Sequence, residues 1–259
     1  MKTVTVRNIT IGAGVPKICV PIVGTRKEEI LGEARAITEL PADIVEWRAD
    51  WFADVFRVGA VCEVLKSLRQ ILGERPLLFT FRTENEGGER SIEKEEYAKL
   101  LLDAALGGCA DLIDVEAFMS EGMEELIDRL HKAGVKVVGS NHDFSGTPGK
   151  DEIVGRLRKM QAMEVDIPKI AVMPRSRSDV LVLLQATAEM TEQYADRPIV
   201  TMSMAGIGVV SRVCGEVFGS AMTFGAAGKA SAPGQPDVRD LKEMLRMLHT
   251  VSGRGGEEK

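Results

Sequence analysis

The sequence predicts a (β/α)8 barrel, in which eight parallel strands alternate with helices around one axis, and three observations support this fold class. Eight short runs rich in β-branched residues occur along the chain, and segments with helical periodicity separate them. The runs begin about 29 residues apart on average, which is the size of one βα unit. Several runs are apolar along most of their length, as expected for strands covered on both faces.

The predicted strands follow one another in a regular series along the chain. They cover residues 17–23, 43–49, 76–81, 111–116, 135–140, 167–173, 198–204 and 220–224. After the first strand, Ile30, Ala34 and Ile37 recur at helical spacing, and the segments 92–106, 123–132, 153–163, 180–194 and 238–248 repeat this pattern. Thr25 with Glu28 has the spacing of a capping box and predicts a helix start. Thr147 before Pro148 predicts another.

An open, doubly wound sheet is the alternative fold for such an alternating pattern. That fold usually has a glycine-rich fingerprint after its first strand, whereas residues 23–29 read VGTRKEE. We therefore predict one barrel domain over residues 1–252. Residues 1–14 are expected to form a hairpin that covers the barrel floor, and residues 253–259 are expected to be a disordered tail.

The composition excludes several classes of protein. A chain of 259 residues with 44% hydrophobic and 28% charged residues can bury a large core, so bulk disorder is excluded. A net charge of −6 argues against a basic nucleic-acid-binding face. The four cysteines form no C-x-x-C pair and the three histidines are scattered, so no metal site is expected. No apolar run suits a signal peptide or membrane span, and we expect a cytoplasmic protein.

Polar residues collect at the predicted carboxyl ends of the strands, where barrel enzymes have their active sites. Almost every strand contributes at least one of them. They are Glu46, Arg48, Asp50, Arg82, Glu86, Glu116, Ser140, Asn141, His142, Asp143, Lys169, Ser203, Arg212, Lys229, Ser231 and Gln235. We therefore expect a charged site that many strands build together at one mouth of the barrel.

Lys169 is the strongest single signal, because it interrupts the otherwise apolar run VDIPKIAVM at residues 165–173. Lysine is rarely buried without a partner. Burial disfavours the charged form of an amine, and a neutral amine can attack a carbonyl group to form a Schiff base. A strand-end lysine that extends to solvent has the same sequence pattern, so both interpretations stay open.

His142 is the only histidine at a predicted strand end. An imidazole titrates near neutral pH and can take up and return protons, although a loop histidine with local hydrogen bonds fits the pattern as well. His131 and His249 lie in surface patterns at helix ends.

Three arginines at one mouth, Arg48, Arg82 and Arg212, indicate an anionic or hydroxyl-rich ligand. Glu46 and Glu86 could orient these arginines, and either could accept hydrogen bonds from substrate hydroxyls or from a histidine. Residues 225–236 are rich in Gly, Ala, Ser and Pro, which suits a mobile lid. An ordinary flexible loop has the same composition.

Six motifs in register on the predicted strands resemble one enzyme family. They are EWR at 46–48, FRTENEGG at 81–88, SNHDF at 140–144, PKI at 168–170, SR at 211–212 and SAPGQ at 231–235. Their order and spacing cover roughly residues 16–248. The pattern is similar to that of the type I 3-dehydroquinate dehydratases of the shikimate pathway.

The resemblance implies a reaction and a role for each residue. Lys169 would form an imine with the C3 ketone of 3-dehydroquinate, and His142 would remove the C2 proton and protonate the departing C1 hydroxyl. Glu86 would orient His142. Arg212 would pair with the substrate carboxylate, helped by Ser231 and Gln235 as the lid closes, while Glu46, Arg48 and Arg82 would bind the ring hydroxyls.

The products would be 3-dehydroshikimate and water, and no metal or organic cofactor would be needed. The resemblance also implies a homodimer. Two other functions share parts of this pattern: a Schiff-base aldolase on the same barrel, and a non-catalytic barrel that only binds a metabolite or partner.

Overall fold

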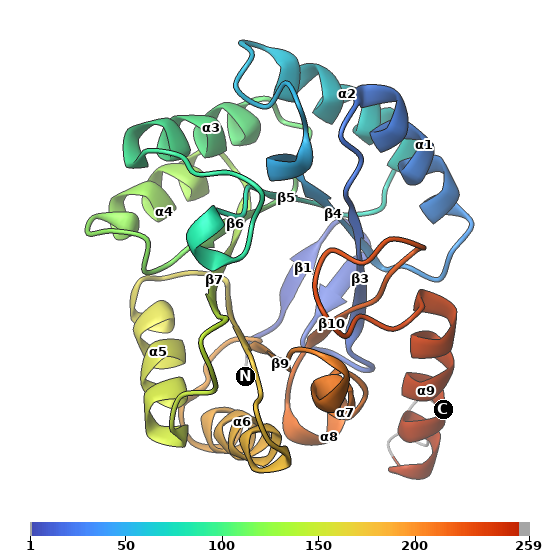
Figure 1. Cartoon of the computed structure of the whole chain (residues 1–259), viewed down its shortest axis with the longest axis vertical. Helices are drawn as coiled ribbons and strands as arrows, with labels where there is room; N and C mark the ends of the chain where they lie inside the picture. The colour runs from blue at the N-terminus through green and yellow to red at the C-terminus, as the bar shows by residue number, and fades with distance from the viewer. Residues whose placement is uncertain (1, 254–259) are drawn as a thin grey trace.

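The computed structural model describes residues 2–253 and forms a ring of eight parallel strands surrounded by helices (Figure 1). The hydrogen-bonded strand order is β10-β3-β4-β5-β6-β7-β8-β9, and a parallel bridge between Ile199 and Ser220 joins β9 to β10. The (β/α)8 barrel predicted from the sequence is therefore confirmed. The strands are β3 (Lys17–Ile22), β4 (Ile44–Arg48), β5 (Leu77–Thr80), β6 (Leu112–Glu116), β7 (Lys136–Asp143), β8 (Ile167–Val172), β9 (Val200–Ser203) and β10 (Met222–Phe224).

Helices follow the strands and cover the outside of the ring. They are α1 (Lys27–Thr38), α2 (Ala60–Leu72), α3 (Lys94–Leu106), α4 (Met123–Lys132), α5 (Lys150–Ala162), α6 (Arg177–Glu189), α7 (Val209–Val213), α8 (Gly215–Phe218) and α9 (Val238–Val251). α2 was not among the helices predicted from the sequence, although its buried residues Val61, Leu65, Leu68 and Leu72 recur at helical spacing. Apart from Gly253, the predicted tail at 253–259 lies outside the described residues.

The two predicted helix starts were wrong by one residue, at α1, and by two residues, at α5. The N-cap of α1 is Arg26, and the Glu29 carboxylate, rather than that of Glu28, accepts hydrogen bonds from the Thr25 hydroxyl (2.8 Å) and backbone N–H (3.0 Å). The threonine thus donates to the carboxylate instead of capping the helix. The N-cap of α5 is Gly149, two residues after Thr147, and the Thr147 hydroxyl donates to the Met173 carbonyl (3.2 Å).

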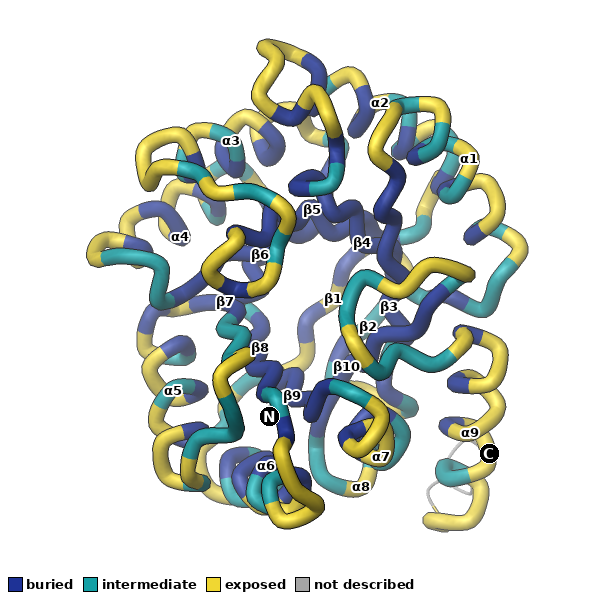
Figure 2. Tube along the Cα trace, viewed as in Figure 1, coloured by how far each residue is buried: buried dark blue, intermediate teal, exposed yellow. Residues whose placement is uncertain are grey.

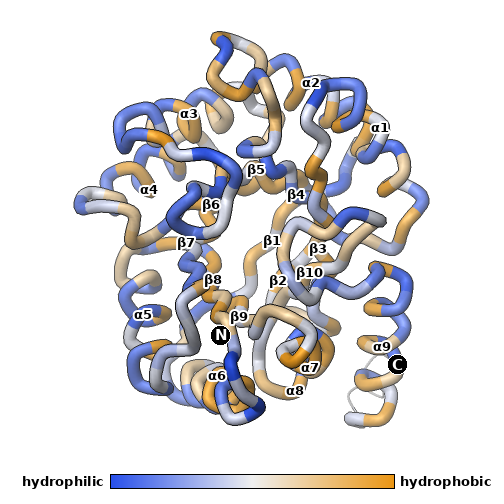
Figure 3. The backbone as a smooth tube through the Cα atoms, viewed as in Figure 1, coloured by the Kyte–Doolittle hydropathy of each residue, from blue (hydrophilic) through white to orange (hydrophobic). Residues whose placement is uncertain are grey.

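Successive residues of each strand face opposite sides of the barrel wall. On β4, Val45 and Trp47 face outward and pack against the helices, whereas Ile44 faces the barrel interior. Figures 2 and 3 show the result: the strands are buried, and the helices turn apolar faces to the wall and polar faces to solvent. The molecule therefore has an outer core between strands and helices and a smaller inner core inside the ring.

An antiparallel hairpin of β1 (Val4–Val6) and β2 (Ile9–Ile11) closes the barrel floor and lies at its far end in Figure 1. Val4, Val6 and Ile11 belong to the inner core, together with the inward residues at the amino ends of the strands. The predicted floor hairpin is therefore confirmed, and it leaves the carboxyl ends of the strands as the open mouth.

Candidate active site

The two-residue period of the strands explains why polar side chains meet at the mouth. The first inward position near the floor is apolar on most strands. On β4, β6 and β7 the inward positions two and four residues later are polar, and on β8 the position two residues later is polar. The inward series are Ile44, Glu46 and Arg48 on β4, Leu112, Asp114 and Glu116 on β6, Val138, Ser140 and His142 on β7, and Ile167 and Lys169 on β8. A sealed apolar layer thus supports a charged layer above it.

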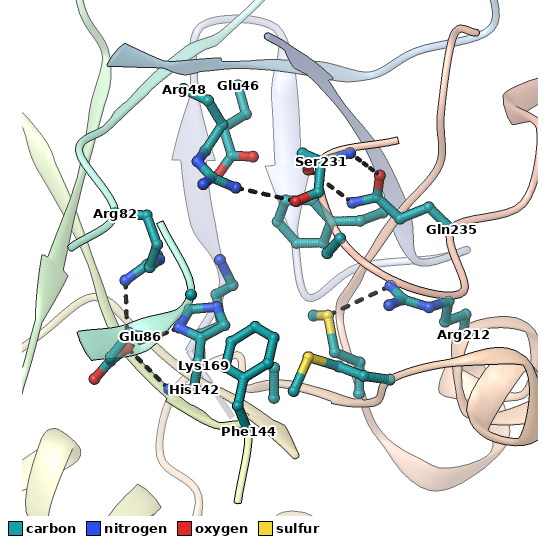
Figure 4. A pocket seen from close by; sticks show the side chains of 16 residues that line it. Glu46, Arg48, Arg82, Glu86, His142, Phe144, Lys169, Arg212, Ser231 and Gln235 are labelled. Atoms are coloured by element: carbon teal, nitrogen blue, oxygen red, sulfur yellow. Dashed lines mark hydrogen bonds and ion pairs between the residues drawn. The ribbon is translucent and has the colours of Figure 1, made fainter. Parts of the chain in front are cut away.

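The nine residues predicted for the site line one cavity at this mouth (Figure 4). They are Glu46, Arg48, Arg82, Glu86, His142, Lys169, Arg212, Ser231 and Gln235. Apolar side chains, among them Phe144, Met202, Met204 and Phe224, complete the lining. The fold therefore brings together residues that are up to 189 positions apart, from Glu46 to Gln235.

Lys169 points into this cavity from β8 and does not reach solvent, since only 3% of the residue is exposed. Its Nζ lies 3.4 Å from Asp114 Oδ2 and 4.6 Å from the centroid of the Phe224 ring. The solvent-extended lysine that the sequence left open is thus not the observed arrangement. A buried amine beside a carboxylate, at the wall of a cavity, is placed to react with a bound carbonyl group.

Asp114 was not among the predicted site residues. It is fully buried and accepts hydrogen bonds from Arg82 Nη2 (2.8 Å) and Ser140 Oγ (2.6 Å). Burial alone would raise the pKa of Asp114, but the charges of Arg82 and Lys169 outweigh it and lower that pKa below its usual value. The signal that could have found it is its inward position on β6, midway between Leu112 and Glu116.

Arg82 is buried at the centre of a group of acids. Its Nη1 donates to Glu116 (3.0 Å), to the Ser140 hydroxyl (3.0 Å) and to Glu86 (3.4 Å), and its Nη2 donates to Asp114. The guanidinium therefore neutralises charges that burial would otherwise make costly.

Glu86 and His142 form a hydrogen-bonded pair at the cavity wall. Glu86 ends the 3-10 turn η2 (Glu84–Glu86), and its Oε2 lies 2.8 Å from His142 Nδ1 and 2.9 Å from the His142 backbone nitrogen. Burial raises the pKa of Glu86, whereas the charge of Arg82 and the hydrogen bond from Asn141 oppose this rise and favour the carboxylate. Burial and the nearby cations Arg82, Lys169 and Arg48 lower the pKa of His142 well below its usual value. The imidazole is therefore neutral near pH 7 and can accept a proton.

Arg48 and Glu46 occupy the same side of the cavity, both from β4. Arg48 makes a two-pronged ion pair with Asp50, through Nε–Oδ1 (2.8 Å) and Nη2–Oδ2 (2.7 Å). Glu46 accepts a hydrogen bond from the Thr80 hydroxyl (2.9 Å). Asp50, which the sequence analysis placed at the strand end but not in the site, therefore sets the direction of Arg48.

Arg212, from α7, is a buried cation that pairs with no carboxylate among residues 2–253. Its Nη2 donates to the Pro233 carbonyl (3.2 Å), its Nη1 lies 3.5 Å from Met202 Sδ, and its Nε has no hydrogen-bond partner in this part of the chain. Burial lowers the pKa of Arg212 to about 10. An unpaired buried guanidinium beside a cavity is a site for an anionic ligand.

The loop predicted as a lid, residues 225–236, lies across the mouth between β10 and α9 (Figure 1). Gln235 exchanges two hydrogen bonds with Ser231, and Arg48 Nη1 donates to the Ser231 carbonyl (3.3 Å). Gly234 has φ +79° and lies so close to the Ala205 carbonyl that a Cβ would collide with it. The loop thus touches both sides of the mouth; its mobility stays a prediction.

Comparison with known proteins places this chain in a family. The type I 3-dehydroquinase family model matches residues 18–252. A 3-dehydroquinate dehydratase from Shigella dysenteriae is 54% identical over 250 residues, covering 96% of this chain and 99% of its own. No helix among the described residues has the length and apolar character needed to cross a membrane.

Solved structures agree with the sequence comparison. The type I 3-dehydroquinate dehydratase from Clostridium difficile, with covalent modified comenic acid, has a TM-score of 0.94 and 53% identity, and the match covers 96% of this chain and 99% of that one. The 3-dehydroquinate dehydratase from Geobacillus kaustophilus has a TM-score of 0.94 and 39% identity, with 97% and 98% covered. Because both the family model and these relatives span nearly its whole length, the chain belongs to the type I 3-dehydroquinase family.

Proposed function

We propose that this chain dehydrates 3-dehydroquinate to 3-dehydroshikimate and water through an imine on Lys169. One observation carries the proposal: a buried lysine amine, a histidine–carboxylate pair and an arginine without an acidic partner among residues 2–253 face the same cavity. The substrate has a ketone at C3, an acidic proton at C2, a hydroxyl leaving group at C1 and a carboxylate. Each of these groups has a complementary side chain in the cavity.

The first step joins the substrate to the protein. Lys169 passes one proton to His142 and attacks C3 with its amine nitrogen. The carbonyl oxygen takes up one proton from that nitrogen and one from the His142 imidazolium and departs as water, which leaves a protonated imine. The buried Asp114 carboxylate, 3.4 Å from the lysine nitrogen, stabilises the positive charge of that imine. The protonated imine withdraws electrons from C2 and so makes the C2 proton acidic.

Elimination then follows with one residue as base and acid. His142 removes the C2 proton through Nε2, and the electron pair of the resulting enamine expels the C1 hydroxyl. The imidazolium returns a proton to that hydroxyl, which leaves as water. Glu86, held against Nδ1, stabilises the transient imidazolium. Water finally hydrolyses the imine, releases 3-dehydroshikimate and regenerates Lys169.

The remaining residues bind and orient the substrate. Arg212 pairs with the carboxylate, and Ser231 with Gln235 completes this contact from the loop above. Glu46 and Arg48 bind the ring hydroxyls of the substrate. Arg82 is already bonded to three acids and a serine, so its main contribution is to hold them in place, and its contact with a substrate hydroxyl stays a prediction.

Two other functions were compatible with the sequence alone. A Schiff-base aldolase would use the same lysine to break a carbon–carbon bond, but membership of the 3-dehydroquinase family favours dehydration. A barrel that only binds a metabolite would form no covalent adduct. The covalent modified comenic acid in the Clostridium difficile relative supports a nucleophile in this family.

Borohydride reduction in the presence of 3-dehydroquinate, followed by intact mass and peptide mapping, tests the proposal. We expect one stable adduct on Lys169, and none in Lys169→Ala, which should have lost turnover while keeping its fold. Lys159→Ala, on the outer face of α5, serves as the matched lysine control and should be trapped like the wild type. An adduct at another lysine, or turnover by Lys169→Ala, would overturn the assignment.

A further inference from the structure

A side chain on the outer face of β7 links the candidate active site to a helix outside the barrel. His142 faces the cavity, and its neighbour Asn141 faces the other way, toward α5. There it lines a separate surface recess together with Phe118, Glu152, Gly155, Arg156 and Lys159. Asn141 belongs to the SNHDF motif but has no part in the chemistry described above.

The side-chain amide of Asn141 accepts a hydrogen bond from Arg156 and donates one to Glu86. Its Oδ1 accepts from Arg156 Nη1 (3.0 Å), and its Nδ2 donates to Glu86 Oε1 (3.1 Å). A guanidinium can only donate, so the amide must turn its oxygen toward Arg156 and its NH2 toward Glu86. Glu86 Oε1 is therefore an acceptor.

The other oxygen of Glu86 is constrained in the same way. Oε2 accepts from the His142 backbone N–H, which can only donate, and also faces His142 Nδ1. If Glu86 is a carboxylate, Nδ1 carries the ring proton and Nε2 presents a lone pair to the cavity. If Glu86 is protonated on Oε2, the proton on Nδ1 moves to Nε2, and the ring can no longer act as a base there.

We propose that Arg156, acting through Asn141, is a positioning residue that favours the carboxylate form of Glu86, by directing the Asn141 NH2 group at Oε1, and so holds His142 in the tautomer with a free Nε2. The inference rests on the proposed function, in which His142 Nε2 is the base. Arg156 itself lies outside the cavity and touches neither substrate nor reacting atoms.

The surrounding charges show why such support is needed. Burial and the neighbouring carboxylates Glu116 and Asp114 favour the protonated form of Glu86, whereas Arg82 and the Asn141 hydrogen bond favour the carboxylate. Lys169, Arg82 and Arg48 face His142 and disfavour its protonation. Arg156 also pairs with Asp143 (3.1 Å) and Glu152, and these contacts hold its side chain against β7.

Steady-state kinetics over a range of pH test the proposal. Removing the donors should favour protonated Glu86, so the acid limb of the kcat profile should move to higher pH by about one unit in Asn141→Leu and Arg156→Met, the size expected for one hydrogen bond to a charged group. KM should change little, and Arg156→Lys should restore part of the shift. Lys159→Met, which removes a positive charge from the same recess but not a bond to Asn141, is the matched control and should keep the wild-type profile.

Nitrogen NMR of the substrate-free protein gives a readout that does not depend on the reaction. We expect the His142 proton on Nδ1 in the wild type and in Lys159→Met, and an increased Nε2–H population in Arg156→Met. Unchanged tautomer and pH profile in folded Arg156→Met and Asn141→Leu would overturn the inference. Absence of a trapped adduct on wild-type Lys169 would instead overturn the proposed function, whatever the NMR shows.

Discussion

Arg212 differs from the other two arginines of the site in having no acidic partner among the described residues. Arg48 is paired with Asp50, and Arg82 with Asp114 and Glu116. The unpaired guanidinium is buried at a cost in free energy that a bound carboxylate would offset. This difference supports the proposal that Arg212 binds the carboxylate of the substrate.

We therefore predict that Arg212→Lys weakens substrate binding substantially although the charge is kept, because an ammonium group cannot make a two-pronged pair with a carboxylate. Steady-state kinetics would show this as a raised KM. The effect should fade for a substrate analogue without the carboxylate. If both substrates suffered equally, Arg212 would be a structural residue, and the carboxylate site would have to be sought at Arg48 or Arg82.

His142→Ala should separate imine formation from elimination. Lys169 remains in this variant, so some imine should still form, while proton transfer at C2 and C1 should slow by roughly 10²–10⁴-fold, as is typical of a lost general acid–base group. Borohydride trapping should then yield an adduct that accumulates before product appears. Near-normal dehydration would show that another group is the base, with Glu86 the first candidate.

At the scale of elements, the same two hydrogen bonds recur at the barrel floor between β3 and β4, between β5 and β6, and between β7 and β8. An aspartate just before a strand donates its backbone N–H to a carbonyl of the preceding strand, and its carboxylate accepts the N–H of that same residue. The pairs are Asp43 with Ile18, Asp111 with Leu77, and Asp166 with Val137, and the carboxylate contacts measure 2.7, 2.8 and 2.8 Å. These side chains fix neighbouring strands at the end opposite the cavity.

Asp43→Ala should therefore lower the free energy of unfolding without affecting kcat. The buried Ile18 N–H would lose its acceptor, which costs about 1–3 kcal/mol. Urea unfolding would measure the loss, and Asp43→Asn, which keeps an acceptor oxygen, should recover most of it. The exposed Asp54→Ala is the control and should stay within about 0.5 kcal/mol of the wild type. An equal loss in Asp43→Asn would contradict the hydrogen-bond explanation.

At the scale of the whole molecule, the barrel works because its two ends differ. The hairpin seals the floor with apolar side chains of the inner core, and the mouth carries the charged layer under the loop 225–236. The sealed floor leaves the mouth as the side from which the cavity is reached, and it keeps the buried charges of the site away from solvent on the other side.

Ile11→Ala should test this division between stability and function. Ile11 is fully buried in the inner core, so its truncation should cost about 2–5 kcal/mol of unfolding free energy, through lost transfer energy and the cavity left behind. Because the floor is remote from the mouth, kcat should stay unchanged while the protein is folded. Val58→Ala, at a position 92% exposed, is the control and should change neither quantity. A lower kcat in folded Ile11→Ala would show that the floor supports the site directly.

The amino-acid sequence determined the barrel, its floor hairpin and the identity of the residues that line the cavity. These depend on local periodicity: strand length, the apolar runs and the two-residue alternation that places Glu46, His142 and Lys169 on the inner face. The same rule would have found Asp114. Helix starts were less predictable. The Thr25 hydroxyl donates to the Glu29 carboxylate and the Thr147 hydroxyl to the Met173 carbonyl, and neither threonine caps a helix.

Only the tertiary structure decided which charges are paired. Whether Arg82 meets Asp114, whether Arg212 stays without a carboxylate, and whether Asn141 connects Arg156 to Glu86 all depend on contacts between different strands, helices and loops. Such contacts are set when the ring closes and the strand register is fixed, since a shift of one residue would turn each side chain to the opposite face. The residue types of the site can be identified from the sequence. Their protonation states and hydrogen-bond partners depend on burial and on neighbouring side chains that come together only in the folded barrel.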